Sequence, residues 1–424
     1  MVASSAQPSP YVLDKENPVT AAPEKTDDVQ GPLAGLRVVE MGQLLAGPFC
    51  GQLLSDLGAD VIKLEDPAKG DPMRQWGRRR PSGESLWWSV VARNKRCVTL
   101  NLREKDGQEV ARRLVATADI VIENFRPGTL EKWGMDYESL KADNRGLILV
   151  RVSGYGQSGP YSQRPGYGSI GEAMGGLRYV VGDPTTPPSR MGISIGDTLA
   201  AMFGALGALS ALEARRRTGE GQVVDSAIYE SVLAIMESLV PEFQVTGYQR
   251  ERTGAVLPNV APSNVYPTKD GSWILIAANQ DTVFARLAHA IGQPALISDS
   301  RYATHAARGE HQEELDDLIA EYTITLDVEE LEKLLVESAV PVGKIFRAAE
   351  MMTDPHFIAR ESITTVDHPV LGEVAMQNVF PRLSRTPGRV RWPGAPLGAH
   401  TDEVLAELGM DSDEIGGLRE KGIA

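Results

Sequence analysis

Short apolar runs alternate with amphipathic stretches over the first half of the chain. The runs Leu36–Met41 and Asp60–Glu65 are rich in branched apolar residues, and Pro48–Leu57 between them has helical spacing with a proline in its first turn. A strand, a helix and a second strand in this order predict a βαβ unit, whose strands pair in parallel through a right-handed crossover.

The same alternation continues to about residue 152. Further strands are predicted at Cys97–Leu102, Asp119–Glu123 and Leu147–Val152. Helices are predicted at Asp106–Ala118 and near Thr129–Lys141. The first half therefore predicts an α/β domain built on a parallel sheet.

A long helix rich in small residues is predicted over Thr198–Arg216. Ala200, Gly204 and Ala208 fall four residues apart on one face, where they would let another backbone approach closely. Alanine also simply favours helices, so the pattern leaves both interpretations open.

The pattern changes after a stretch, 247–267, that contains three prolines and predicts a loop or linker. An apolar strand, Trp273–Ala277, follows a turn, and helices are predicted at Asp281–Ile291, Gln312–Thr323 and Val328–Ala339. This change predicts a smaller α+β domain at 226–354, inserted into the first one.

The remaining segments complete this division of the chain. Residues 1–31 lack apolar periodicity and predict a disordered tail. The large α/β domain is then expected to comprise 32–225 and 355–424, including a capped helix at Thr401–Leu408.

Composition and charge narrow the class of protein. The chain has 424 residues, and its 43 Lys and Arg against 57 Asp and Glu give a formal net charge of −14. An acidic protein is a poor partner for nucleic acid or an anionic membrane surface. No continuous run of about 18 apolar residues is found, which predicts that nothing spans a bilayer.

The cysteines and the tail bear on the compartment. Cys50 and Cys97 are too few for a disulfide framework, and with no recognisable zinc pattern beside them we expect no metal. The tail lacks arginine and an apolar core, which argues against a targeting peptide. The sequence therefore predicts a cytoplasmic protein.

Familiar catalytic motifs are absent or out of context. All six histidines lie beyond residue 288, and the GxSxG string at Gly192–Gly196 follows a proline-rich run rather than a strand. The turn Gly42–Pro48 after the first strand is not a dinucleotide fingerprint. It still directs the start of a helix towards the sheet edge, which suits an anionic group.

Basic residues concentrate in one segment. Residues 74–103 hold eight of them and a single acid, Glu84. The basic residues are Arg74, Arg78, Arg79, Arg80, Arg93, Lys95, Arg96 and Arg103. The segment would suit a ligand with several phosphates or a dianionic substrate. A surface loop paired with acids elsewhere in the chain would give the same pattern.

Asp197 opens the small-residue helix and has two interpretations. Most aspartates at a helix start are N-caps. However, the helix dipole and free N–H groups also keep such a carboxylate ionised, and an ionised carboxylate can attack an activated carbonyl without a base.

A series of short motifs, in order over about 33–410, resembles class III CoA-transferases of the formyl-CoA transferase and carnitine CoA-transferase type. The motifs are Leu44–Pro48, Asp56–Glu65, Gly70–Pro72, Asn94–Arg96, Val121–Gly128, Ser153–Pro160, Arg164–Tyr167, Gly196–Asp197, Thr218–Gln222 and Leu397–Thr401. The resemblance implies an interlocked homodimer, each chain having a large Rossmann-like domain built from both chain ends and a smaller inserted domain.

The resemblance also implies a mechanism and a set of contacts. Asp197 matches the catalytic aspartate, which forms an anhydride with the donor acyl group and then a thioester with CoA. The positions that match CoA contacts are Leu45, Ala46, Leu100, Arg103, Asn124, Phe125, Lys132 and Tyr167. The basic segment would then lie near CoA phosphates and a substrate carboxylate.

Substrates follow less directly from the same resemblance. Members that this chain resembles use succinyl-CoA and a dicarboxylate such as malate, citramalate, itaconate, mesaconate or glutarate. Arg93 and Arg308 match positions that could hold the distal carboxylate, although Arg308 could equally be an exposed residue beside a helix. Gln43 could tune the choice of acceptor.

Two departures from related members matter. Leu45 replaces a glutamine of formyl-CoA transferases, whose glycine-rich loop has no counterpart here, so oxalate or formate specificity is not expected. Tyr167–Gly168 replaces the His–Asp pair of 2-methylacyl-CoA racemases. The alternative functions are a 2-methylacyl-CoA racemase, an acyl-CoA hydrolase and a non-catalytic CoA-binding protein. The alternative to a homodimer is pairing with a paralogous subunit. No prosthetic group is expected.

Overall fold

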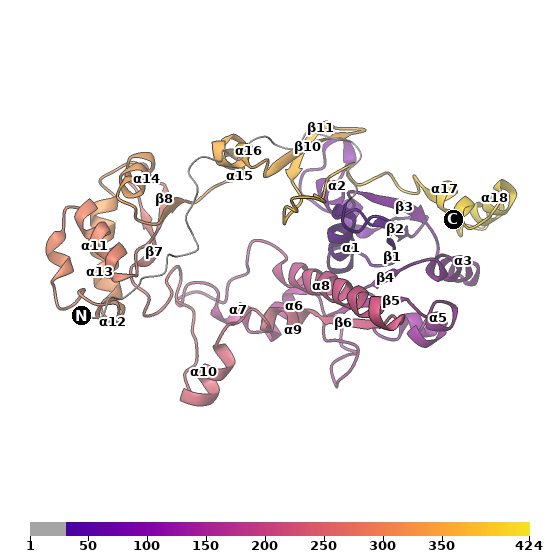
Figure 1. The fold of residues 1–424 in the computed structure, drawn as a ribbon, viewed down its shortest axis with the longest axis horizontal. Coiled ribbons are helices and arrows are strands. Elements are labelled where there is room, and N and C mark those ends of the chain that lie inside the picture. The colour runs from indigo at the N-terminus through magenta and orange to yellow at the C-terminus, as the bar shows by residue number, and fades with distance from the viewer. Residues whose placement is uncertain (1–30) are drawn as a thin grey trace, which may run out of the picture.

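A parallel six-stranded sheet forms the centre of the larger lobe (Figure 1). The computed structural model describes residues 31–424, so the predicted tail lies outside the described residues except for Gly31. The strands are β1 Arg37–Glu40, β2 Asp60–Glu65, β3 Lys95–Thr99, β4 Ile120–Glu123, β5 Ile148–Ser153 and β6 Val223–Ala227. Their order, β3-β2-β1-β4-β5-β6, reverses direction between β1 and β4. This is the doubly wound order of Rossmann-type folds, and it confirms the predicted α/β class.

Helices cover both faces of this sheet. The helices that pack on it are α1 Ala46–Asp56, α3 Lys105–Ala116, α5 Tyr137–Asp143, α8 Ile195–Thr218, α17 Thr401–Glu407 and α18 Ser412–Glu420. Along β1, Val38 faces the cluster that contains α1 and α8, whereas Val39 faces the cluster that contains α3, α17 and α18. Strands covered on both faces read as continuous apolar runs, which is the pattern of the sequence.

The helix α8 lies as closely on the sheet as its small residues allow. A Cβ on Gly204 would be 3.3 Å from Cγ1 of Val150, and the hydroxyl of Ser226 donates to the carbonyl of Ala200 at 2.9 Å. By length and composition alone α8 could cross a membrane. It packs instead against α1, β5 and β6, as the central helix of this lobe.

Shorter elements line the rims of the larger lobe. They are α2 Leu86–Val91, α4 Thr129–Lys132, α6 Gly168–Met174, α7 Leu177–Val180, α9 Ile228–Leu233 and α10 Leu239–Thr246, with 3-10 turns at Pro72–Gln75 and Pro81–Gly83. The boundary predicted between residues 225 and 226 falls within β6, and α9 packs against α6 and α8. The division into two domains therefore stays a prediction.

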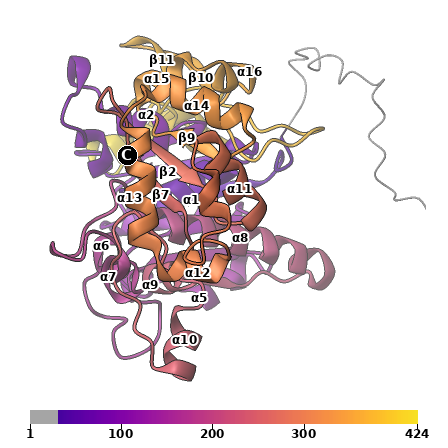
Figure 2. The same cartoon turned by 90° about the vertical axis from the view of Figure 1, so that its left-hand side faces the viewer.

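A smaller lobe follows in the chain. It contains the antiparallel strands β7 Ser263–Pro267, β8 Trp273–Ala277 and β9 Val342–Lys344, the helices α11 Asp281–Ala290, α12 His305–Glu310, α13 Gln312–Thr323 and α14 Val328–Glu337, and a 3-10 turn at Pro294–Ile297. Phe284, Leu315 and Leu331 pack with the buried face of β8. Figure 2 shows α11, α13 and α14 grouped on one side of the molecule.

The chain then returns to the larger lobe. It passes through α15 Ala348–Thr353, α16 Pro355–Ala359 and the hairpin β10 Ile363–His368 with β11 Gly372–Gln377. The amide of Asn94 joins the returning chain, since it donates to Arg389 O at 2.8 Å and accepts from Arg391 N at 2.6 Å. Residues from both ends of the described chain thus build this lobe.

Candidate functional site

The loops after β1 and β4 meet at the carboxyl edge of the sheet. The N–H of Gln43 donates to Oδ1 of Asn124 at 2.7 Å, and Nδ2 of Asn124 donates to the carbonyl of Gln43 at 2.9 Å. A Cβ on Gly42 or Gly47 would be 3.0 or 3.3 Å from this amide. Asn124 therefore joins the two loops at the point where the strand order reverses, which is where doubly wound sheets bind ligands.

Buried charged side chains fix the conformation of the loop after β1. Nζ of Lys63 is 2.8 Å from Oδ2 of Asp71 and 3.3 Å from Oε1 of Glu40, and the N–H of Leu44 donates to Asp71 at 3.0 Å. Burial would lower the pKa of Lys63, but Asp71 and Glu40 raise it above its ordinary value. Leu44 adopts φ 63°, a strained value for a leucine, so this loop conformation is fixed by its surroundings.

The residues predicted to contact CoA all follow the carboxyl ends of strands. Leu45 is the N-cap of α1 and Ala46 its first residue. Leu100 and Arg103 follow β3, Asn124 and Phe125 follow β4 with Lys132 on α4, and Tyr167 precedes α6. Leu45, Ala46 and Leu100 are buried, whereas the side chains of Arg103, Lys132 and Tyr167 are exposed. The fold thus places these positions along one edge of one sheet; their contacts with CoA stay a prediction.

Asp197 lies in the first turn of α8 and is not its cap. The helix begins at Ile195 after Ser194, so Asp197 is its third residue. Its carboxylate lies directly over Gly168, where a Cβ would be 2.3 Å from Oδ2. A Cβ on Gly196 would likewise be 2.8 Å from the carbonyl of Gly168. The starts of α6 and α8 therefore meet through glycine backbones around this carboxylate.

The environment of Asp197 disfavours its charged form. Burial raises the pKa of Asp197 to about 6, the carboxylate of Glu172 on α6 adds to the rise, and the exposed Arg190 opposes it. Among the described residues, none donates a hydrogen bond to this carboxylate. At neutral pH the group is ionised and available as a nucleophile or base, because its pKa lies below 7.

Arg93 does not have the surroundings expected of a substrate ligand. Its Nη2 is 2.6 Å from Oδ2 of Asp56, its Nε also donates to that carboxylate, and its Nη1 donates to the carbonyl of Gln377. The side chain is almost wholly buried. Arg93 therefore joins α1 to the returning hairpin, and the expected contact with a substrate carboxylate does not fit this geometry.

Arg308 is engaged in the same way in the smaller lobe. Its guanidinium is fully buried and donates to the carbonyls of Ala261, Tyr302 and Asn279 and to Asp281 at 2.7 Å. Neither an exposed position nor a free fork for a carboxylate is present. The interpretation as a substrate ligand does not fit here either.

The basic segment separates into two groups in the structure. Arg74, Arg93, Lys95 and Arg96 pair with acids of the same chain, including Glu65, Glu40 and Glu407. Arg78, Arg79, Arg80 and Arg103 are exposed, and Arg103 is 3.5 Å from Asp66. Within the basic segment, this second group is the one whose exposed side chains can attract an anion.

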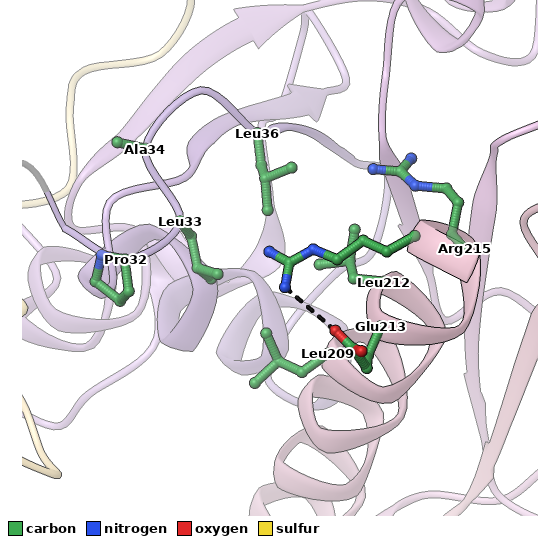
Figure 3. Close-up of a pocket in the computed structure, with 9 residues that line it drawn as sticks. Pro32, Leu33, Ala34, Leu36, Leu209, Leu212, Glu213 and Arg215 are labelled. Atoms are coloured by element: carbon green, nitrogen blue, oxygen red, sulfur yellow. Dashed lines mark hydrogen bonds and ion pairs between the residues drawn. The ribbon is translucent and has the colours of Figure 1, made fainter. Parts of the chain in front are cut away.

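A cavity beside α8 lies away from Asp197. It has a volume of ≈ 350 Å³ and is lined by Pro32–Ala34, Leu36, Leu209, Leu212, Glu213, Arg215 and Arg216. Figure 3 shows Leu33 and Leu36 around Leu209 and Leu212, with an ion pair between Glu213 and Arg216 beside them. It lies at the carboxyl half of α8, so it is not the site around the start of that helix.

Two features of the site were not identified from the sequence. Glu172 beside Asp197 carries no local motif. Lys63 and Asp71 both lie in motifs of the resemblance, but nothing in the sequence indicates that they pair. Gly168 did carry a signal, because together with Tyr167 it replaces the His–Asp pair of racemases. In the structure a side chain there would overlap the Asp197 carboxylate, which argues further against the racemase alternative.

Metal and disulfide chemistry find no support in the described part of the chain. No group of three His, Cys, Asp or Glu side chains there could hold a metal ion. Cys50 and Cys97 are both free and buried.

The fold and the site define a doubly wound α/β protein with an ionisable carboxylate at the ligand-binding edge of its sheet. The chain belongs to CoA-transferase family III, whose sequence pattern matches residues 33–401. It is 60% identical to a Chloroflexus aurantiacus succinyl-CoA–D-citramalate CoA-transferase over 92% of this chain and 98% of that protein. It is 42% identical to the alpha subunit of a succinyl-CoA–L-malate CoA-transferase of that organism, over 94% of each chain. The structure of a Brucella suis CAIB/BAIF family protein has TM-score 0.80 and 36% identity, over 89% of this chain and 100% of that one.

Proposed function

We propose that the protein transfers CoA from succinyl-CoA to a dicarboxylic acid of the citramalate or malate type. The observation that carries this proposal is the Asp197 carboxylate, ionised at neutral pH and lying over the backbone of Gly168 at the start of α8. Family membership supports CoA transfer, and the names of the two Chloroflexus relatives support the donor and the class of acceptor.

The first half of the reaction loads CoA onto the enzyme. An oxygen of Asp197 attacks the thioester carbonyl of succinyl-CoA, the C–S bond breaks, and CoA leaves as a thiolate from a mixed anhydride. The thiolate attacks Cγ of Asp197, the anhydride C–O bond breaks, and succinate leaves. The enzyme then carries CoA as an aspartyl thioester.

The second half runs the same chemistry with the acceptor. A carboxylate of the acceptor attacks Cγ of Asp197 and displaces the CoA thiolate, which gives a second anhydride. The thiolate attacks the acyl carbon of the acceptor and releases the Asp197 carboxylate with the new acyl-CoA. No proton is taken up or lost in either half of the reaction, so the mechanism needs no histidine beside Asp197.

We assign the remaining site residues to binding. Leu45, Ala46, Leu100, Asn124 and Phe125 would line the CoA chain, and Arg103 and Lys132 would attract its phosphates. Tyr167 would lie at the acyl end, beside Gly168, and Gln43 would contact the acceptor.

We further propose an interlocked homodimer. Several large apolar side chains are exposed in this lobe: Tyr167 before α6, Leu206 on α8, and Phe243 and Val245 on α10. An exposed apolar surface of this kind marks an interface between chains. Figures 1 and 2 show α10 extending away from the rest of the chain. Pairing with a paralogous subunit is the alternative, since the malate transferase of Chloroflexus has alpha and beta subunits. We place the protein in the cytoplasm, whose reducing conditions suit its two free cysteines.

The test is turnover with succinyl-CoA and a panel of carboxylic acids, with acyl-CoA products read by mass. We expect a new dicarboxyl-CoA and free succinate from the wild-type protein and neither from Asp197→Asn. Retained transfer by Asp197→Asn would contradict the mechanism. Free CoA without an acyl-CoA product would indicate a hydrolase.

A further inference from the structure

A second carboxylate, Glu172, lies beside Asp197 without a full set of partners. It is on α6, one helical turn after Gly168, and is 2% exposed. Its Cγ lies 3.4 Å from the place that a Cβ of Gly196 would take, so it packs against the residue directly before Asp197. The two acids are therefore held close by the glycine contacts that join α6 to α8.

The charge of Glu172 is only partly compensated. Oε2 accepts from Nη2 of Arg178 at 2.9 Å, but Oε1 is buried and has no hydrogen-bond partner among the described residues. Nε of Arg178 is also without a partner. A carboxylate that served packing alone would have both oxygens satisfied, because an unpaired buried oxygen is costly.

The other groups around Asp197 do not cancel this charge. Arg190, before α8, is exposed and also contacts Ser194. From α9, the side chain that reaches this turn is Ile228, which is apolar. Of the two charged groups that act on Asp197, Glu172 and Arg190, only Glu172 is buried.

We infer that Glu172 is a positioning residue that acts through Asp197, by disfavouring the free aspartate relative to its acylated forms. This inference rests on the proposed function. A free Asp197 carries a negative charge beside Glu172, whereas the anhydride and the CoA thioester carry none at that atom. Repulsion between the two carboxylates is therefore relieved when Asp197 attacks the donor, and the enzyme–CoA thioester is favoured.

The pKa of Asp197 is raised to about 6 rather than lowered, as a helix start alone would do. Burial is the larger cause and Glu172 the next. Removing the charge of Glu172 should stabilise the free carboxylate and so oppose loading with CoA.

The experiment measures the loading equilibrium directly. Protein is incubated without acceptor at fixed ratios of succinyl-CoA to succinate and quenched in acid. Intact-protein mass spectrometry then gives the fraction that carries CoA, and peptide mapping locates the adduct. For Glu172→Gln we expect the equilibrium constant for the thioester to fall about tenfold, one unit of pKa being a factor of ten. The acid limb of kcat/KM should also move to lower pH.

Two further variants make the result specific. Arg178→Gln removes the cation that compensates Glu172, so its thioester equilibrium should shift the opposite way. Glu213→Gln is the matched control, because Glu213 is also paired with an arginine but lies four turns further along α8. It should behave as wild type.

The outcomes separate the two proposals. An adduct on Asp197 with the same equilibrium constant and pH profile in wild type and Glu172→Gln would overturn the role of Glu172 and leave the proposed function intact. No adduct on Asp197 in the wild-type protein would overturn the proposed function itself.

Discussion

The carboxylate of Asp197 is harder to ionise in the folded protein than in the unfolded chain. Burial raises its pKa from 3.8 to about 6, so the folded state holds the proton more tightly. The stability that this proton contributes is complete below about pH 4 and is lost as the pH rises through 6. At pH 7.5 the ionised group therefore lowers the free energy of unfolding.

Asp197→Asn should consequently abolish activity and raise the free energy of unfolding. We expect no turnover and, because the site is partly open to solvent, a gain of about 1–3 kcal/mol in the free energy of unfolding at pH 7.5. At pH 4 the gain should largely disappear. Urea denaturation at the two pH values checks this, and an equal change at both would show that the charge is not its cause.

Gly168 affects the same carboxylate sterically rather than electrostatically, because it leaves room for the Asp197 side chain. A Cβ there would be 2.3 Å from Oδ2 of Asp197, so Gly168→Ala must turn the nucleophile away. We expect kcat to fall by about 10²-fold with the fold retained. Gly416→Ala is the control, since nothing lies within 4 Å of its Cβ position. Unchanged kcat in Gly168→Ala would mean that the carboxylate reacts from another orientation.

At the scale of elements, three of the predicted ranges match the structure to the residue, and others, such as Pro48–Leu57 for α1, differ by one or two residues. Asp60–Glu65, Trp273–Ala277 and Gln312–Thr323 have the expected bounds, because alternating or helical periodicity is complete within each. The helix predicted at Thr129–Lys141 is instead two helices. Gly134 between them adopts φ 67°, which interrupts the helix although the apolar spacing continues.

Interactions across long sequence separations could not be predicted. The strand β7 lies within the predicted loop 247–267, since its prolines conceal it and its pairing with β8 is not visible locally. The basic segment is similar: Arg96 pairs with Glu403 and Glu407, more than 300 residues away. The sequence could place the site at the carboxyl edge of the sheet, but not say which of its charges would be neutralised.

Arg93 pairs with Asp56 of α1 and also donates to the carbonyl of Gln377 at the end of β11, so it connects the two parts of the chain that build the larger lobe. Removing one partner leaves an uncompensated buried charge, so Arg93→Ala should lower the free energy of unfolding by about 3–5 kcal/mol. Arg78→Ala, from the exposed group of the same segment, should change it little. Chemical denaturation of both variants checks this. A raised KM for the acceptor with unchanged stability would restore Arg93 as a substrate ligand.

For the whole molecule, the exposed apolar surface on α8 and α10 predicts an assembly. We expect light scattering to give about twice the 45.9 kDa of one chain. Leu206→Asp introduces a charge on the exposed face of α8 and should lower the mass towards one chain. Val336→Asp, at an equally exposed apolar position of α14, is the control. A monomeric wild-type protein would contradict the proposed dimer.

Residues 401–423 pack against the edge of the sheet that β3 forms. The N–H of Asn101, just after β3, donates to the carbonyl of Ile423 at 2.7 Å, and α17 and α18 cover that end of the lobe. Although domains generally fold from the N-terminus during synthesis, this one lacks part of its core until residues 401–423 have left the ribosome. Until then β3, which is at the edge of the sheet, lacks this cover and is open to pairing with other chains.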